Sequence, residues 1–201
     1  TSIYNPGRYK HRVNPRENPD FRIDRPDART REIQEMILVQ QFTYIGAPHI
    51  WYGDEVGMWG GDDPDPRKPM LWSDLEYEPE VTHPMGLERR PDAVAPDMRL
   101  FRTYQEMVAL RKNHLRLLVD GDLTWLAADD ANGVLAYQRS LGDERAVVLF
   151  NRSEDVMEVS VPVDPGTYTE QWPGDYTLRV EDNLTVQLLP LYASVWLRVD
   201  E

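Results

Sequence analysis

The sequence predicts a mixed α/β portion over residues 1–120, followed by an all-β antiparallel sandwich over residues 121–201. Two segments before residue 120 carry apolar residues at spacings of three and four, which is typical of amphipathic helices. After Gly121, short alternating runs recur about every 8–12 residues and are separated by turn residues, which is typical of antiparallel strands. A long proline-rich loop lies between the two helical segments, and such loops usually serve a function.

The composition excludes several classes of partner. A net charge of −13 argues against binding to nucleic acid or to anionic membranes. The chain has no cysteine, which rules out disulfides and thiolate metal sites but leaves the cellular compartment open. No run of 18 apolar residues is present, and no phosphate-binding glycine loop or regular metal-ligand spacing occurs. We therefore expect no cofactor, no metal, no nucleic acid and no membrane partner.

The first helix is expected from Asp27 or Thr30 to about Phe42, after an irregular segment over residues 1–26. Its predicted buried face consists of Ile33, Met36, Ile37, Gln41 and Tyr44. Gly46 and Pro48 end this helix and begin an apolar run, residues 48–52, which we predict to be a buried strand. Such a helix, turn and strand form half of a βα repeat, which cannot bury both sides of its strand alone.

A loop over residues 53–96 contains seven prolines, and a second helix follows from residue 98 to about 114 with Asp97 as its cap. The predicted buried face of that helix consists of Leu100, Phe101, Tyr104, Met107, Val108 and Leu115. The strands of the sandwich are predicted at 123–128, 134–140, 145–151, 156–163, 167–172, 176–181, 184–189 and 192–199.

Residues 60–70 are the best candidates for a binding site. Asp63 and Arg67 stand four residues apart, and Trp59 and Trp72 flank the segment. Guanidinium and carboxylate groups can form paired hydrogen bonds with vicinal sugar hydroxyls, and an indole offers a flat face to a sugar ring. The alternative is that the acids and Arg67 pair with each other and hold the loop in shape.

Asp54 and Glu55 follow the predicted strand and could be taken for a general acid and base. Neighbouring residues at the end of a strand point to opposite sides, so these two carboxylates are poorly placed to share one substrate atom. His49 lies within the apolar run and is expected to be packed rather than reactive. We predict no catalytic residue in this chain.

Two segments carry a resemblance to a known family. GAPHIWYGDEVGM, residues 46–58, resembles the last barrel strand of the α-amylase family of glycoside hydrolases. GGDDPDPRKPMLW, residues 60–72, resembles the following loop in the neopullulanase, cyclomaltodextrinase and maltogenic amylase branch, with Pro66 where a cysteine often stands. The resemblance implies that Asp63 and Arg67 bind sugar units. It further implies that residues 1–120 are the C-terminal fragment of a TIM (β/α)8 barrel, with the sandwich as the C-terminal domain.

The resemblance also implies that the catalytic carboxylates of the family cannot be mapped onto this chain. The chain is then expected to contribute a binding loop to an enzyme acting on α-glucans (starch, pullulan or cyclodextrins), and to be inactive alone. Its partners would be an α-glucan oligosaccharide and one of three protein partners: the missing N-terminal barrel portion, a separately encoded N-terminal portion, or a second copy. The alternative function is a stand-alone carbohydrate-binding module that holds sugars on Trp125, Trp172 and Trp196.

Overall fold

The computed structural model describes residues 15–16, 18, 21–61 and 67–199. The helical elements are α1 (Ala28–Thr43), the 3-10 turn η1 (Asp54–Val56), α2 (Met98–Asn113) and α3 (Leu115–Asp120). The strands are β1 (Asp122–Asp129), β2 (Val134–Leu141), β3 (Glu144–Asn151), β4 (Met157–Pro162), β5 (Gly166–Trp172), β6 (Thr177–Val180), β7 (Asn183–Leu188) and β8 (Tyr192–Val199). Every predicted strand after residue 121 is confirmed, with ends that differ by at most two residues.

The chain divides into two compact units, which do not follow the predicted boundary at residue 120. Unit 1 comprises Thr1–Arg31 and His49–Thr103, and unit 2 comprises Glu32–Pro48 and Tyr104–Glu201. The C-terminal parts of α1 and α2 thus belong to the same unit as the strands.

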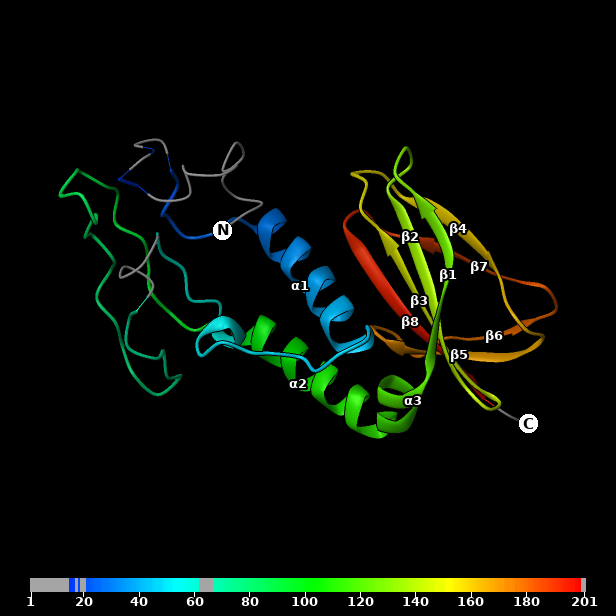
Figure 1. Cartoon of the computed structure of the whole chain (residues 1–201). Helices are drawn as coiled ribbons and strands as arrows, with labels where there is room; N and C mark the ends of the chain where they lie inside the picture. The colour runs from blue at the N-terminus through cyan, green and yellow to red at the C-terminus, as the bar shows by residue number, and fades with distance from the viewer. Residues whose placement is uncertain (1–14, 17, 19–20, 62–66, 200–201) are drawn as a thin grey trace. The chain divides into compact units, whose positions relative to one another are not determined.

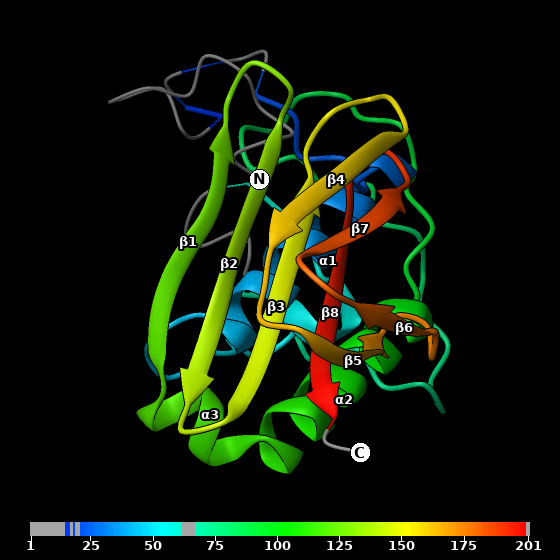
Figure 2. The same ribbon diagram turned by 90° about the vertical axis from the view of Figure 1, so that its right-hand side faces the viewer.

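Unit 2 is built on two antiparallel sheets. The larger has six strands in the order β1-β2-β3-β8-β5-β6, and the smaller pairs β4 with β7. Figure 2 shows β4 and β7 crossing in front of β3 and β8. The register places Val147 opposite Trp196 in the large sheet and Val159 opposite Val186 in the small one. Among the described residues every strand pair is antiparallel, so the barrel portion expected for residues 1–120 is not seen as a parallel sheet.

The space between the two sheets is filled by a single apolar core. Its buried members are Ala136, Val147, Leu149, Val159, Val161, Tyr168, Val180, Leu184, Leu188 and Trp196. β4 shows the predicted alternation, because Val159 and Val161 are buried while Glu158 and Ser160 are exposed. Trp196 lies within this core rather than at the surface, and its indole N–H donates to Ser194 Oγ at 2.9 Å.

The opposite face of the large sheet is covered by helices, which the sequence patterns did not predict. Figures 1 and 2 show the C-terminal halves of α1 and α2 on the side away from β4 and β7. The hydroxyls of Thr43 in α1 and Tyr137 in β2 lie 2.7 Å apart, and α3 contributes Leu117 to a small cluster with Ala146 and Leu197. β3 is consequently buried on both faces, so it lacks the alternation of a half-exposed strand. Unit 2 therefore has three layers.

Two buried arginines join these helices to the sheet. Arg139, fully buried on β2, donates to the carbonyls of Thr43 and Leu118 at 3.0 Å and of Gly121 at 2.6 Å. Arg111 donates to the carbonyls of Phe42 and Gly46, both at 2.6 Å. These carbonyls lie at or just beyond helix C-termini, where they have no intrahelical donor and where a positive charge is favourable. Burial lowers the pKa of both guanidinium groups, and the charge of Arg139 lowers that of Arg111 further.

The two long helices begin where predicted. Asp27 accepts hydrogen bonds from the Thr30 backbone N–H at 2.8 Å and from its hydroxyl at 2.6 Å. Asp97 accepts from the Leu100 N–H at 3.0 Å. Both aspartates therefore act as N-caps, which satisfy backbone donors that have no partner within the helix.

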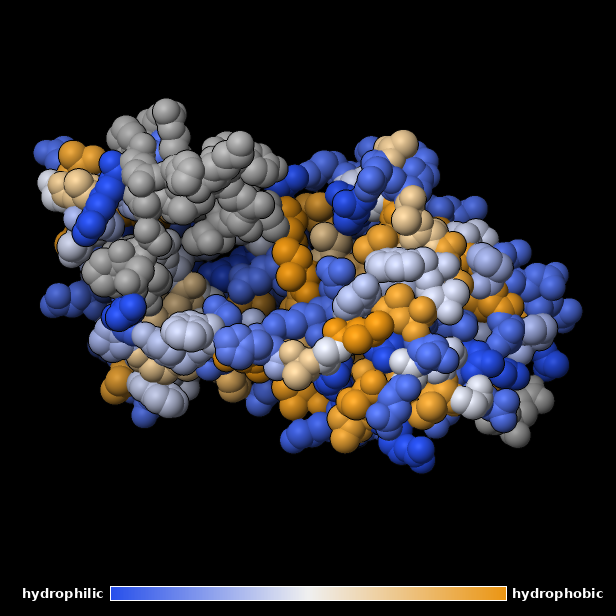
Figure 3. Space-filling view, in the orientation of Figure 1, coloured by the Kyte–Doolittle hydropathy of each residue, from blue (hydrophilic) through white to orange (hydrophobic). Residues whose placement is uncertain are grey.

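The predicted buried faces of these helices were partly wrong. Ile37 is 48% exposed, whereas Leu38 and Val39 are buried on α1. Leu115 is 53% exposed and begins α3, while Leu110 and Arg111 are buried on α2. Apolar residues of α1 point to several sides of the helix, so their spacing alone does not show which side is buried. Figure 3 shows hydrophobic residues at the surface beside α1 and α3, among hydrophilic ones.

The predicted strand at residues 48–52 is also wrong, because the structure assigns no strand there. A parallel strand needs neighbours on its edges, and the described residues of unit 1 provide none. Ile50, Trp51 and Tyr52 are consequently exposed at 39%, 62% and 47%. His49 is likewise exposed rather than packed. No helix in the described part of the chain is long and apolar enough to span a membrane.

Candidate functional site

The turn after residue 52 uses both of its acids to hold the backbone. Asp54 accepts a hydrogen bond from the Trp51 N–H at 3.2 Å, and Glu55 accepts from the Gly53 N–H at 2.9 Å. Desolvation raises the pKa of the Asp54 carboxyl, although much of the side chain is exposed, and the Trp51 N–H opposes the shift. Each carboxylate is engaged by its own turn, and the expectation that neither is catalytic stays a prediction.

Arg31 at the start of α1 and Asp97 at the start of α2 hold the same turn in place. Arg31 donates to the carbonyl of Gly57 at 2.6 Å and lies 3.5 Å from the carboxylate of Asp97. The N–H of Asp97 donates to the Val56 carbonyl at 2.9 Å. Gly57 has φ of +68°, and a Cβ there would lie 2.7 Å from the Arg31 guanidinium. A glycine is therefore required at this close approach.

Of the two predicted sugar-binding residues, Asp63 and Arg67, the structure describes Arg67. Asp63 lies outside the described residues. Arg67 lies at the start of the next described segment, and its side chain is exposed. The next residue, Lys68, is partly buried, as expected for neighbours in an extended segment that point to opposite sides. Arg67 is thus available to solvent while Lys68 is directed into unit 1.

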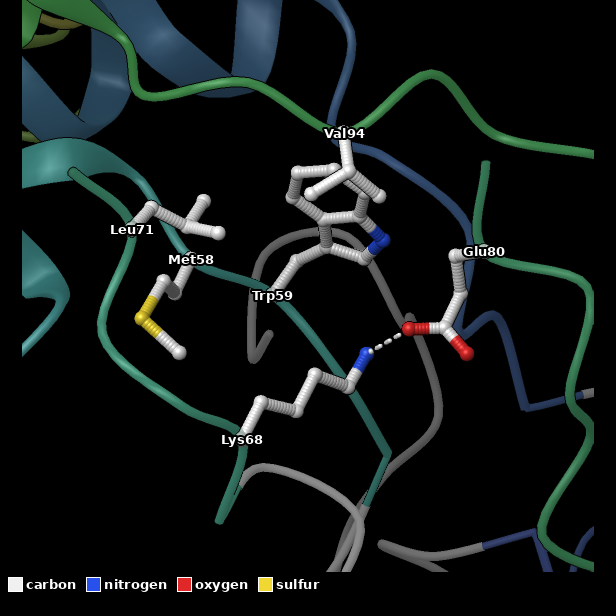
Figure 4. A pocket seen from close by; sticks show the side chains of 6 residues that line it. All are labelled: Met58, Trp59, Lys68, Leu71, Glu80 and Val94. Atoms are coloured by element: carbon white, nitrogen blue, oxygen red, sulfur yellow. Dashed lines mark ion pairs between the residues drawn. The ribbon is translucent and has the colours of Figure 1, made fainter. Parts of the chain in front are cut away.

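Lys68 is held by an ion pair beneath a tryptophan. Its ammonium lies 2.7 Å from a carboxylate oxygen of Glu80 and 5.8 Å from the ring centroid of Trp59. Figure 4 shows the Lys68 side chain extending past the indole of Trp59 towards Glu80. Met58 and Leu71 lie on the side of Lys68 that faces away from Glu80. Arg25 also lies 5.8 Å from the Trp59 ring centroid. A cation near an indole face is stabilised by the ring quadrupole.

Glu80 is itself fixed by a second group of contacts. Its backbone pairs with that of Asp92 through two hydrogen bonds of 2.8 and 3.0 Å, which close the excursion over residues 81–91. Arg89, whose side chain is only 6% exposed, pairs with Asp92 and lies 3.9 Å from Glu80. Its guanidinium also donates to the carbonyls of Thr82 at 3.0 Å and Ile23 at 3.4 Å. Three irregular segments of unit 1 therefore meet at this ionic cluster.

The pocket at this cluster is too small to hold a sugar. It is lined by Met58, Trp59, Lys68, Leu71, Glu80 and Val94. Its volume is about 20 Å³, far below the roughly 300–1,000 Å³ of pockets for small molecules. The pocket therefore lies among the contacts that hold Lys68 in place. A glucan would have to bind the loop on its exposed side.

The tryptophans proposed for a stand-alone sugar-binding sandwich are mostly covered. Trp172 is 8% exposed, stacks on Tyr192 and donates its indole N–H to Glu106 at 3.1 Å. Trp196 is 4% exposed in the core. Only Trp125 of the three is substantially exposed, at 49%, and it contacts Tyr44 and Tyr137. Two of the three expected platforms are therefore not accessible.

Lys68, Glu80 and Arg89 were missed by the sequence reasoning. Their pairing joins residues 9 and 12 positions apart in a loop without periodicity, and such pairing leaves no local pattern. One signal was available, because Lys68 precedes Pro69, which restricts Lys68 to an extended backbone and sets its side chain opposite Arg67. No group of three or more potential metal ligands occurs among the residues that the structure describes.

Comparison with known proteins agrees with the antiparallel fold. A family model described as "Maltogenic Amylase, C-terminal domain" matches residues 123–196. A solved α-amylase from Anoxybacillus has a similar fold, with a TM-score of 0.66 and 22% identity, over 84% of this chain and 32% of that one.

Two curated relatives show higher identity. A cyclomaltodextrinase of Geobacillus thermopakistaniensis is 35% identical over 130 residues, which are 65% of this chain and 19% of the relative. Neopullulanase 2 of Thermoactinomyces vulgaris is 32% identical over 158 residues, which are 77% of this chain and 24% of the relative. The chain thus spans about a fifth to a quarter of the length of these proteins. It carries a maltogenic amylase C-terminal domain and is a relative of the cyclomaltodextrinases, neopullulanases and maltogenic amylases of the α-amylase family.

Proposed function

We propose that this chain is the C-terminal portion of a glycoside hydrolase that acts on α-glucans, to which it contributes a substrate-binding loop. A cyclomaltodextrinase and a neopullulanase are 35% and 32% identical to the chain, which supports an α-glucan as the substrate. Residues 1–120 would complete the last part of a (β/α)8 barrel, and residues 121–201 would be its C-terminal domain. The exposed Arg67, next to an anchored Lys68, is the observation on which the binding role rests.

In this proposal Asp63 and Arg67 contact sugar hydroxyls. A guanidinium can donate two parallel hydrogen bonds to vicinal oxygens, and a carboxylate accepts from hydroxyl groups. Hydrogen bonds to charged groups contribute roughly 1.5–3 kcal/mol each, so loss of the Arg67 contact should weaken binding about 10- to 100-fold.

Calorimetric titration of the chain with maltotriose tests this role. Arg67→Ala and Asp63→Ala should each weaken or abolish the binding that the unaltered chain shows. Arg116→Ala is the matched control, because Arg116 is an exposed arginine on α3 with no proposed contact. If the chain fails to bind maltotriose, or if Arg67→Ala binds as the control does, the loop is not a glucan site.

We propose further that the chain has no hydrolytic activity by itself. Asp54 and Glu55 are hydrogen-bonded to their own turn, and the resemblance maps none of the family's reacting carboxylates onto this chain. Incubation with starch, pullulan or cyclodextrin should release no reducing sugar. Release that disappears in Glu55→Gln would contradict this proposal and restore a catalytic role to the turn.

The exposed apolar residues of both units support a protein partner. Ile50 and Trp51 in unit 1 and Ile37 and Ile45 in unit 2 are each 39–62% exposed. Exposed apolar patches often mark interaction sites. An N-terminal barrel portion or a second copy of the chain would cover them, and light scattering should show association at high concentration. A monomer at all concentrations would argue against self-association.

A further inference from the structure

We infer that Lys68 is a positioning residue for Arg67: its ion pair with Glu80 beneath Trp59 fixes the backbone from which the exposed Arg67 side chain projects towards the glucan. This inference rests on the proposed function of Arg67 and adds residues to which the resemblance assigned no role. It follows from the exposure of two adjacent side chains and from the contacts that hold one of them.

The backbone at Lys68 has little freedom. A residue that precedes proline is restricted to extended conformations, and Pro69 follows Lys68. The Tyr52 hydroxyl also donates to the Lys68 carbonyl at 3.3 Å. In an extended segment the side chains of consecutive residues point to opposite sides. When Lys68 is held inward, Arg67 is therefore held outward.

The contacts of the Lys68 side chain within unit 1 hold this surface loop firmly. The Lys68 and Glu80 side chains are only 23% and 16% exposed, so water screens this pair less than an open surface pair. Leu71, which is 7% exposed, lines the same pocket and fixes the segment three residues further along. Glu80 in turn cannot move freely, because its backbone is paired with Asp92 and Arg89 lies beside its carboxylate.

The anchor should matter for binding because a sugar contact requires a guanidinium held in one orientation. A side chain ordered before binding loses less conformational entropy when the ligand arrives. Removal of the Lys68 charge should loosen the backbone of this segment, so that Arg67 is presented less consistently on the exposed side and binds a glucan less tightly. The expected loss is about 3- to 10-fold, which is smaller than that for removal of Arg67 itself.

The test uses the 201-residue chain with maltotriose as the probe. Lys68→Met keeps the aliphatic stem but removes the charge, and we expect it to weaken maltotriose binding about 3- to 10-fold. Lys68→Arg, which can still pair with Glu80, should bind within about twofold of the unaltered chain. The double variant Arg67→Ala/Lys68→Met should bind no worse than Arg67→Ala alone, because Lys68 acts through Arg67.

A second readout does not depend on the ligand. The NMR order parameters of the backbone amides of Lys68, Met70 and Leu71 should fall in Lys68→Met and stay as in the unaltered chain in Lys68→Arg. Lower order parameters in Lys68→Met, with no maltotriose binding by any form of the chain, would support the anchoring by Lys68 but overturn the proposed glucan contact. Unchanged order parameters, or an equal loss of affinity from Lys68→Met with and without Arg67, would overturn the positioning role.

Discussion

The interactions that stabilise unit 2 internally differ in kind from those that stabilise unit 1. Unit 2 has a six-stranded sheet covered on both faces, with fully buried Val147, Leu149 and Leu184 in the inter-sheet core. The described part of unit 1 consists largely of irregular segments joined by the ion pairs around Glu80 and Arg89. A packed core is insensitive to salt, whereas ion pairs weaken as the Debye length falls from about 10 Å at 0.1 M to 3 Å at 1 M.

Because of this difference, we expect global stability to depend mainly on unit 2 and sugar binding to depend mainly on unit 1. The inter-sheet core and all the strands lie in unit 2, while the candidate sugar contacts lie on the loops of unit 1. Loops that carry binding residues commonly belong to the less stable regions of a protein. Changes in unit 2 should therefore lower global stability, and changes in unit 1 should alter local exchange and binding.

The largest effect is expected from Arg139→Met in unit 2. The variant leaves the buried carbonyls of Thr43, Leu118 and Gly121 without a donor, and each unsatisfied group costs about 1–3 kcal/mol. We expect urea denaturation to show a loss of roughly 3–5 kcal/mol. Arg139→Lys, which can reach fewer of these carbonyls, should lose less. Equal losses in both variants would show that packing rather than donation matters here.

A smaller effect is expected from Leu184→Ala, in the core between the sheets. Leu184 is fully buried on β7, and truncation of such a residue costs about 2–5 kcal/mol through lost burial and the remaining cavity. The loss measured by urea denaturation should be the same at 0.1 and 1 M NaCl. A loss that depends strongly on salt would mean that the two units do not differ as described.

Arg89→Met should act locally in unit 1. Removal of this guanidinium leaves the carboxylate of Asp92 without its pair and removes the donor to Thr82. We expect the Glu80 and Asp92 amides to exchange at least ten times faster, while the amides of β3 are unaffected. In the unaltered chain, 1 M salt should produce a weaker change in the same direction. Slower or unchanged exchange at both amides would contradict the ionic account of unit 1.

The smallest effect is expected from Asp27→Ala at the start of α1, which should cost about 0.5–1 kcal/mol. Hydrogen bonds from the Thr30 side chain and backbone lower the pKa of Asp27 below its ordinary value of 3.8. A carboxyl with a lowered folded pKa contributes stability above its unfolded pKa and loses it as the pH falls through the folded value.

A pH titration separates the charge of Asp27 from its capping bonds. The stability difference between the unaltered chain and Asp27→Asn should be constant at neutral pH and should shrink below about pH 4. Asparagine retains the cap without the titration. A difference that is independent of pH down to 2 would assign no role to the Asp27 charge.

The regular elements were largely predictable because their signals are local. Alternation with turn residues located β1 to β8, and an aspartate before each apolar helical run located the starts of α1 and α2. The segment at 48–52 was predicted as a strand from its apolar residues, but a strand also requires neighbours, and the described residues of unit 1 do not supply them. Ile37 and Leu115 were misassigned because the partner surface selects the buried face of a helix.

The sequence by itself therefore determined the order of the two long helices and the eight strands, the aspartate caps of those helices, and the likeness to the α-amylase family. Only the tertiary structure decided that helices cover the second face of the large sheet, that Arg111 and Arg139 bind the C-terminal carbonyls, and that Lys68 is anchored by Glu80. The physical reason is range along the chain. Periodicity and capping act within a few residues, whereas these contacts join residues from 12 to 96 positions apart and exist only once the chain has folded.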